Sequence, residues 1–110
     1  MAEFIKGDVV VVPFPFSDLS QIKKRPAFVV NKITGDDIIL CQITSQTIKD
    51  KYSIMLKKED FSDGNLSINS NIRPNRIFTT DKSLILYKVG SVKDSKIEEV
   101  IEKIIEIIKN

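Results

Sequence analysis

The sequence predicts a small, mainly β fold that ends in one α-helix. Short runs of β-branched and apolar residues recur over residues 7–92, and turn-forming residues separate these runs. Residues 97–108 follow a different pattern, because their apolar side chains recur at the helical spacing of three and four. Several short strands followed by a terminal helix indicate a strongly bent antiparallel sheet or a small barrel.

Length and composition predict a single domain over residues 1–110. The chain has 110 residues, of which 42% are hydrophobic and 29% charged, as in a soluble globular protein with one core. No apolar run approaches the roughly 20 residues that are needed to span a bilayer. The single cysteine, Cys41, cannot form an internal disulfide, and we therefore expect a reducing, cytoplasmic environment.

Three strands are predicted in the first half of the chain, over residues 7–12, 26–33 and 38–44. Pro13 and Pro15 are expected to stop regular pairing of the first strand. Residues 17–24 are polar and turn-like, which predicts an exposed loop. The turn sequence TGDD separates the second strand from the third, so these two strands should form a hairpin.

Shorter elements are predicted in the second half. Ile54 and Leu56 alternate in a fourth strand, and a turn is expected at Asp63-Gly64. A short strand is expected around residues 76–79. Residues 83–92 fit either a strand or a short helix that leads into a strand.

The C-terminal helix is the clearest element. Its apolar stripe consists of Ile97, Val100, Ile101, Ile104, Ile105 and Ile108. Ser95 followed by Glu98 fits a capping box at the start of the helix. The stripe has to be buried against the sheet or against a partner.

The chain contains no histidine, which limits its possible chemistry. A Ser-His-Asp triad and a ribonuclease mechanism with paired histidines are excluded, and one cysteine leaves too few ligands for an ordinary structural zinc site. We expect neither a metal ion nor a cofactor. The net charge of +2 permits a nucleic-acid partner but does not by itself imply one.

The densest positive charge is the triplet Lys23, Lys24 and Arg25, directly before Pro26. Pro26 favours an extended backbone at Arg25, which would hold the guanidinium at a strand entrance. A planar guanidinium there could bind a phosphate through two hydrogen bonds. The alternative is a basic turn that only faces water, which charge alone favours.

Two further polar clusters could bind a phosphate or a base. The first is ITSQ, where Thr44, Ser45 and Gln46 end the third predicted strand. The alternative reading is ordinary capping of a strand end.

The second polar cluster is SNIRPNR, in which an Arg-Pro pair occurs again at Arg73. Asn71, Asn75 and Arg76 are close to it in the sequence. The alternative reading is a turn that leads into the following strand.

Taken in order, these segments resemble the MazF/PemK family of toxins from type II toxin–antitoxin systems. The resemblance is carried by GDVVVVPF, KKRPAFVV, CQITSQ and DGNLSINSNIRPNRIFTTDKSLI, and it covers nearly the whole chain. It implies an SH3-like barrel of the MazF/CcdB type, a homodimer, and inhibition by a cognate antitoxin protein. It also implies metal-independent cleavage of single-stranded RNA, in which the 2′-hydroxyl attacks the adjacent phosphate and leaves 2′,3′-cyclic phosphate and 5′-hydroxyl ends.

The resemblance also implies roles for individual residues. Arg25 matches the arginine of the family's Arg-Pro pair, Thr44 matches a threonine or serine at the end of the third strand, and Arg73 matches a catalytic arginine of the PemK branch. The residues expected to contact RNA around them are Lys23, Lys24, Ser45, Gln46, Asn75 and Arg76.

Two departures from the PemK pattern bear on activity. That branch has an aspartate where this chain has Asn75, and an amide cannot act as a general base. It also uses a histidine in its first loop, and this chain has none. No residue is therefore assigned to proton abstraction, and a slow or inactive member is an alternative.

Two binding functions compete with RNA cleavage. A non-catalytic toxin of the same fold could act by binding DNA gyrase, as one related toxin does. An RNA-binding barrel without toxicity is the third hypothesis.

Overall fold

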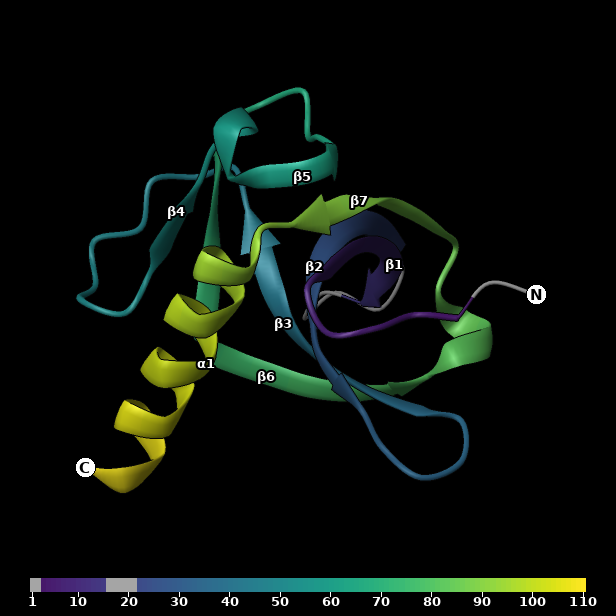
Figure 1. The fold of residues 1–110 in the computed structure, drawn as a ribbon. Helices are drawn as coiled ribbons and strands as arrows, with labels where there is room; N and C mark the ends of the chain where they lie inside the picture. The colour runs from purple at the N-terminus through teal and green to yellow at the C-terminus, as the bar shows by residue number, and fades with distance from the viewer. Residues whose placement is uncertain (1–2, 16–21) are drawn as a thin grey trace.

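The computed structural model describes residues 3–15 and 22–110, which form one curled antiparallel sheet with a helix packed against it (Figure 1). The strands are β1 (Asp8–Pro15), β2 (Ile22–Lys32), β3 (Asp37–Thr44), β4 (Ile54–Leu56), β5 (Phe61–Gly64), β6 (Ser70–Asp81) and β7 (Tyr87–Val92). Their order in the sheet is β4-β6-β3-β2-β1-β7-β5. Two short 3-10 helices (Lys58–Asp60 and Lys82–Leu84) and the helix α1 (Asp94–Lys109) complete the fold.

The mainly β fold with a C-terminal helix is confirmed. The hairpin of β2 and β3 is also confirmed, and residues 82–92 contain a short 3-10 helix followed by a strand. Across the described residues, no helix is both long and apolar enough to cross a membrane.

The expectation that Pro13 and Pro15 stop pairing is wrong. β1 runs through both residues, and Pro15 still lies opposite Ile22 of β2. β1 pairs with β7 only as far as Val11, so in the described structure the remainder of β1 has one unpaired edge. A proline is tolerated there, because its missing N–H can lie on the side where no strand is paired.

The basic triplet belongs to a strand rather than to a turn. β2 begins at Ile22, and Lys23, Lys24 and Arg25 pair across to β1. Pairing of β2 with β3 begins only at Ala27. Pro26, which has no backbone N–H to donate, therefore lies outside the hydrogen bonds between β2 and β3. The predicted loop over residues 17–24 therefore ends at least three residues earlier than expected, because β2 begins at Ile22, and its residues 17–21 lie outside the described structure.

β6 is much longer than the predicted strand over residues 76–79, and it contains an irregular stretch. Cys41 of β3 lies opposite Ile77, whereas the next residue, Gln42, lies opposite Arg73. Residues 74–76 therefore have no partner on β3. Such a bulge explains how Pro74 is accommodated within a central strand, and it sets the direction of the residues on either side.

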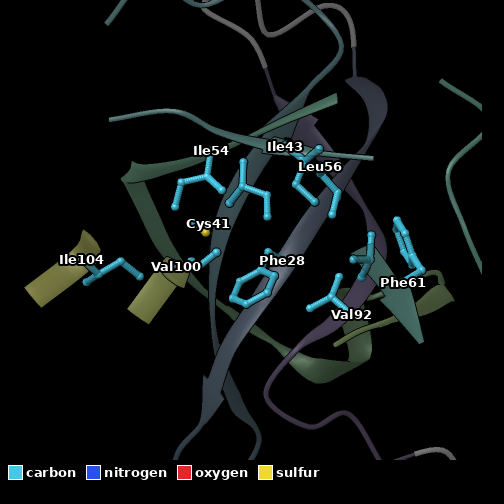
Figure 2. Packing of buried hydrophobic residues seen from close by; sticks show 11 residues of the cluster. Phe28, Cys41, Ile43, Ile54, Leu56, Phe61, Val92, Val100 and Ile104 are labelled. Carbon is cyan, nitrogen blue, oxygen red and sulfur yellow. The ribbon is translucent and has the colours of Figure 1, made fainter. Parts of the chain in front are cut away.

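Side chains from the two faces of the sheet form two apolar clusters. Figure 2 shows the larger cluster, in which Phe28, Cys41 and Ile43 of the sheet meet Val100 and Ile104 of α1. The smaller cluster lies on the other face of β1, β2 and β3, and consists of Val10, Val12, Ala27, Val29, Ile38, Leu40 and Ile85. Because strand residues alternate between faces, the central strands are apolar on both sides.

The helix buries only part of its predicted stripe. Val100 and Ile104 are buried, whereas Ile105 and Ile108 are 49% and 70% exposed. The predicted capping box is wrong, because the helix begins at Asp94 after Lys93, and no side chain caps it.

Candidate functional site

An open groove of about 390 Å³ lies where the start of β2 meets the end of β3. Lys23, Lys24 and Arg25 line it from β2, and Thr44 and Ser45 line it from β3 and the residue that follows. The loop over residues 66–68 closes its other side. The groove therefore brings together five of the predicted site residues.

The register of the sheet explains why Arg25 and Thr44 meet. Ala27 of β2 lies opposite Gln42 of β3. Arg25 and Thr44 are each two residues further towards the groove, and strand alternation returns both side chains to the same face. The side chain of Arg25 is half-buried, so its charge is less screened than that of a fully exposed arginine.

The Thr44 side chain is buried, and its hydroxyl hydrogen remains available for a hydrogen bond to a ligand. It is only 5% exposed, and its Oγ1 accepts a hydrogen bond from the backbone N–H of Gln46 at 3.2 Å. A hydroxyl that accepts one hydrogen bond can still donate its own hydrogen. In the described structure Thr44 can donate that hydrogen to an anion in the groove.

The Arg73 side chain lies on the same face of the sheet as Thr44, two residues along β6 from the position opposite Thr44. It is opposite Gln42 in the β3–β6 pair, while Thr44 is opposite Asn71. The Arg73 Nη2 lies 3.4 Å from the Asp50 Oδ2, and its side chain is only 18% exposed. Its Nε is buried and has no hydrogen-bond partner in the described residues. Arg73 therefore lies beside the groove without lining it, and keeps an unused donor.

Asp50 is fixed by its own loop. Its Oδ1 accepts the backbone N–H groups of Tyr52 and Ser53, each at 2.9 Å. The hydrogen bond from Tyr52 is the main cause that lowers the pKa of Asp50 below its ordinary value, and Arg73 contributes further. Asp50 is thus an ionised partner of Arg73 at neutral pH.

Gln46 connects Thr44 to β6. Besides its N–H bond to Thr44, its backbone carbonyl accepts a hydrogen bond from the Asn71 Nδ2 at 3.0 Å. These two bonds hold the turn after β3 against the sheet, so they fix the position of the Thr44 hydroxyl.

Arg76 and Asn75 lie apart from this groove. Both belong to the irregular stretch of β6, and Asn75 is exposed. Arg76 lines a second, more apolar groove of about 450 Å³ together with Phe14 and Phe78, whose rings meet edge to face at 4.9 Å. The structure does not bring Arg76 to the groove of Arg25.

Asp50 was not among the predicted site residues, and Asn71 was noted only as a neighbour of Arg73. The spacing of Asp50 to Tyr52 and Ser53 is typical of a side chain that caps its own turn, but it does not indicate which cation faces the free oxygen. Asn71 lies in the SNIRPNR segment, where strand alternation with Arg73 places the two on one face.

Residues 5–108 match the family described as PemK-like, MazF-like toxins of type II toxin–antitoxin systems. The chain belongs to this family. A search of curated proteins by sequence finds no match.

Solved structures of MazF toxins share the fold of this PemK/MazF-like chain. MazF from Deinococcus radiodurans superposes with a TM-score of 0.77 at 17% identity, over 100% of both chains. An endoribonuclease from a mycobacterial species, in complex with its cognate antitoxin, gives 0.77 at 11% identity, over 97% of this chain and 96% of the other. The Mycobacterium tuberculosis toxin MazF-mt6 gives 0.67 at 12% identity, over 91% and 96%.

Proposed function

We propose that this PemK/MazF-like toxin is an endoribonuclease that cleaves single-stranded RNA in the groove formed by β2 and β3. The observation that carries the proposal is the meeting of Arg25 and Thr44, from neighbouring strands, in one open groove. Lys23 and Lys24 add positive charge at its wall, which suits a polyanion that passes through.

The proposed reaction needs no nucleophile from the protein. The 2′-oxygen of one nucleotide forms a bond to the adjacent phosphorus, and the bond from phosphorus to the 5′-oxygen breaks. The products are a 2′,3′-cyclic phosphate and a 5′-hydroxyl, which gains a proton as the 2′-hydroxyl loses one. The protein supplies orientation and stabilises the negative charge that builds up on the phosphate.

Arg25 and Thr44 have different roles in this proposal. The guanidinium of Arg25 binds two phosphate oxygens and offsets their charge. The Thr44 hydroxyl donates to a non-bridging oxygen, as its bond from Gln46 leaves its hydrogen available. The Thr44 hydroxyl is fixed before the substrate arrives, so little reorganisation of this group is needed in the transition state.

Arg73 binds the RNA backbone beside the reacting phosphate, and Asp50 positions it. Asp50 is a poor general base, because its pKa is lowered by the Tyr52 hydrogen bond and by Arg73. Its fixed Oδ2 instead holds the guanidinium on the groove side of the sheet.

The proposed partners are a second copy of the chain and a cognate antitoxin. Solved structures of the same fold include an endoribonuclease in complex with its cognate antitoxin, and the matched family is described as toxins of type II toxin–antitoxin systems. An antitoxin that covers the groove would compete with RNA for Arg25.

The proposal is tested by incubating the purified protein with mixed RNA in EDTA and identifying the new ends. We expect fragments with 2′,3′-cyclic phosphate and 5′-hydroxyl ends. Intact RNA would overturn the proposal. Growth arrest with intact cellular RNA would then favour a binding toxin, which a gyrase supercoiling assay would identify.

A further inference from the structure

Asn71 lies next to the proposed reaction centre and has a fixed orientation. It is directly opposite Thr44 in the β3–β6 pair, so the two side chains share a face at neighbouring positions. The Asn71 Nδ2 donates to the backbone carbonyl of Gln46 at 3.0 Å. A carbonyl can only accept a hydrogen bond, so the amide nitrogen must point at Gln46 and the Oδ1 must point elsewhere.

The Asn71 Oδ1 is therefore an acceptor with a set direction. In the described residues it has no hydrogen-bond partner, and the side chain is partly exposed. A phosphate oxygen is also an acceptor, so this atom cannot bind the RNA backbone through its phosphate. It requires a donor, which single-stranded RNA offers on its bases and on its 2′-hydroxyl groups.

The surroundings of Asn71 suit a base better than a hydroxyl. Met55 of β4 lies directly opposite Asn71 and is 60% exposed, although Ile54 and Leu56 on either side are buried. Ile68, which is 62% exposed, lines the groove itself. A methionine thioether makes favourable contacts with aromatic rings, often at the ring edge, and an exposed isoleucine adds apolar surface that a base can cover.

We propose that Asn71 and Met55 form a subsite for the base of a nucleotide adjacent to the scissile phosphate, and that this subsite selects a base with an exocyclic amine over uracil. The inference rests on the proposed function and names the substrate preference of the same site. Adenine, cytosine and guanine can donate an amine hydrogen to the Oδ1. Uracil offers only its N3–H, flanked by two carbonyl oxygens that would face the Oδ1 unfavourably.

The test compares base preferences of the wild type, Asn71→Ala and Asn71→Val. The first readout is the map of 5′-hydroxyl ends in a random RNA pool. The second is the base enrichment of a bound 2′-fluoro RNA pool, which lacks both the attacking nucleophile and the 2′-hydroxyl donor. Asn31→Ala is the matched control, since Asn31 is an exposed asparagine of β2 near the opposite end of the sheet.

We expect the wild type to disfavour uracil at one position about three- to tenfold, which corresponds to one exposed hydrogen bond. Both Asn71 variants should lose this preference at that position and keep the others, and Asn31→Ala should match the wild type. Replacing the preferred base by its analogue without the amine should weaken the wild type and leave Asn71→Ala unchanged.

Other results overturn the inference. An unchanged base profile in both Asn71 variants would do so. A uniform loss at all positions would mean that Asn71 only supports the Gln46 turn. A loss of RNA cleavage in the Asn71 variants that is the same whichever base occupies the position, with unchanged binding of the 2′-fluoro pool, would assign the Oδ1 to a 2′-hydroxyl, which all four nucleotides carry. If the wild type binds the 2′-fluoro pool with the expected preference and does not cut RNA, the proposed cleavage fails and the base subsite stands.

Discussion

Arg25 and Thr44 reach the groove from neighbouring strands, and the hydroxyl of Thr44 can be tested almost in isolation. Thr44→Val keeps the shape and removes one donor to the phosphate. Removing one such donor typically costs about a hundredfold or more in rate. We expect this loss in the cleavage rate of a short RNA.

Thr34→Val is the control for this substitution, because Thr34 is exposed in the turn between β2 and β3, far along both strands from the groove. Equal rates for the wild type and Thr44→Val would remove Thr44 from the mechanism.

Asp50 links the stability of the site to pH. Its pKa is lowered, first by the Tyr52 N–H and further by Arg73, so the ionised carboxylate stabilises the folded state at neutral pH. That contribution is fully present above the ordinary pKa of an aspartate, about 4, and it is lost as the pH falls from there through the lowered pKa of the folded state. Asp50→Asn keeps the turn and removes the charge, so its melting temperature should fall less steeply than that of the wild type between about pH 5 and pH 3.

Thermal melts at a series of pH values check this expectation. Asp36→Asn is a suitable comparison, since Asp36 is an exposed aspartate in another turn. If the melting temperatures of the wild type and Asp50→Asn fall equally steeply across this pH range, the charge of Asp50 does not contribute to the stability of the fold.

The sequence alone predicts some residues of the candidate site and not others. Arg25 and Thr44 lie in short motifs whose strands are recognisable, so their meeting follows from one hairpin. Asp50 is 23 residues from Arg73 in the sequence, and their contact depends on the path of an irregular loop. Local patterns carry no information about such a contact.

β5 and β7 approach each other so closely that glycines are needed at the paired positions Gly64 and Gly90. Gly64 has a positive φ of 69°, and a Cβ there would collide with the Val89 carbonyl oxygen and the Gly90 Cα. Neither backbone atom can move away easily. Gly64→Ala should therefore lower the free energy of unfolding by about 2–4 kcal/mol, from steric overlap added to the strain of the backbone.

Gly35→Ala separates these two contributions. Gly35 also has a positive φ, of 83°, but a Cβ there would meet nothing within 4 Å. It should cost only about 1–2 kcal/mol, as expected for strain alone. Urea unfolding of both variants checks the difference, and equal losses would mean that β5 does not pack tightly on β7.

The elements differ from their predicted bounds mainly at prolines. The sequence predicts that Pro13 and Pro15 stop pairing, that Pro26 begins a strand, and that Pro74 precedes the strand at residues 76–79. In the structure each lies where one side of its strand is unpaired or bulged. The availability of an unpaired edge depends on the order of strands in the sheet, which periodicity does not reveal.

The apolar surface of the whole molecule predicts self-association. Ile105 and Ile108 are exposed on α1, and Leu84 and Leu86 are 53% and 47% exposed beside β7. The unburied part of the helix stripe, Ile105 and Ile108, is apolar surface that a second copy of the chain could cover. We expect a dimer of the 12.5 kDa chain in light scattering at micromolar concentration. A mass that stays at that of one chain would contradict it.

The fold class was predictable from the whole sequence, because strand runs and one helical stripe are separate periodicities. The strong bend of the sheet was predicted with it, whereas the two-sided core and the bulge at residues 74–76 of β6 were not. That bulge also decides that Arg73 faces the groove side while Arg76 lines the second groove.

We propose that RNA is cut in the groove of Arg25 and Thr44. The most direct measurement is the cleavage rate of one short RNA in EDTA by the wild type, Arg25→Ala and the control Lys32→Ala, whose lysine pairs with Glu3 away from the groove. We predict that Lys32→Ala cuts like the wild type and that Arg25→Ala is slower by about a hundredfold or more. Cleavage by Arg25→Ala at the wild-type rate would mean that Arg25 does not act on the scissile phosphate.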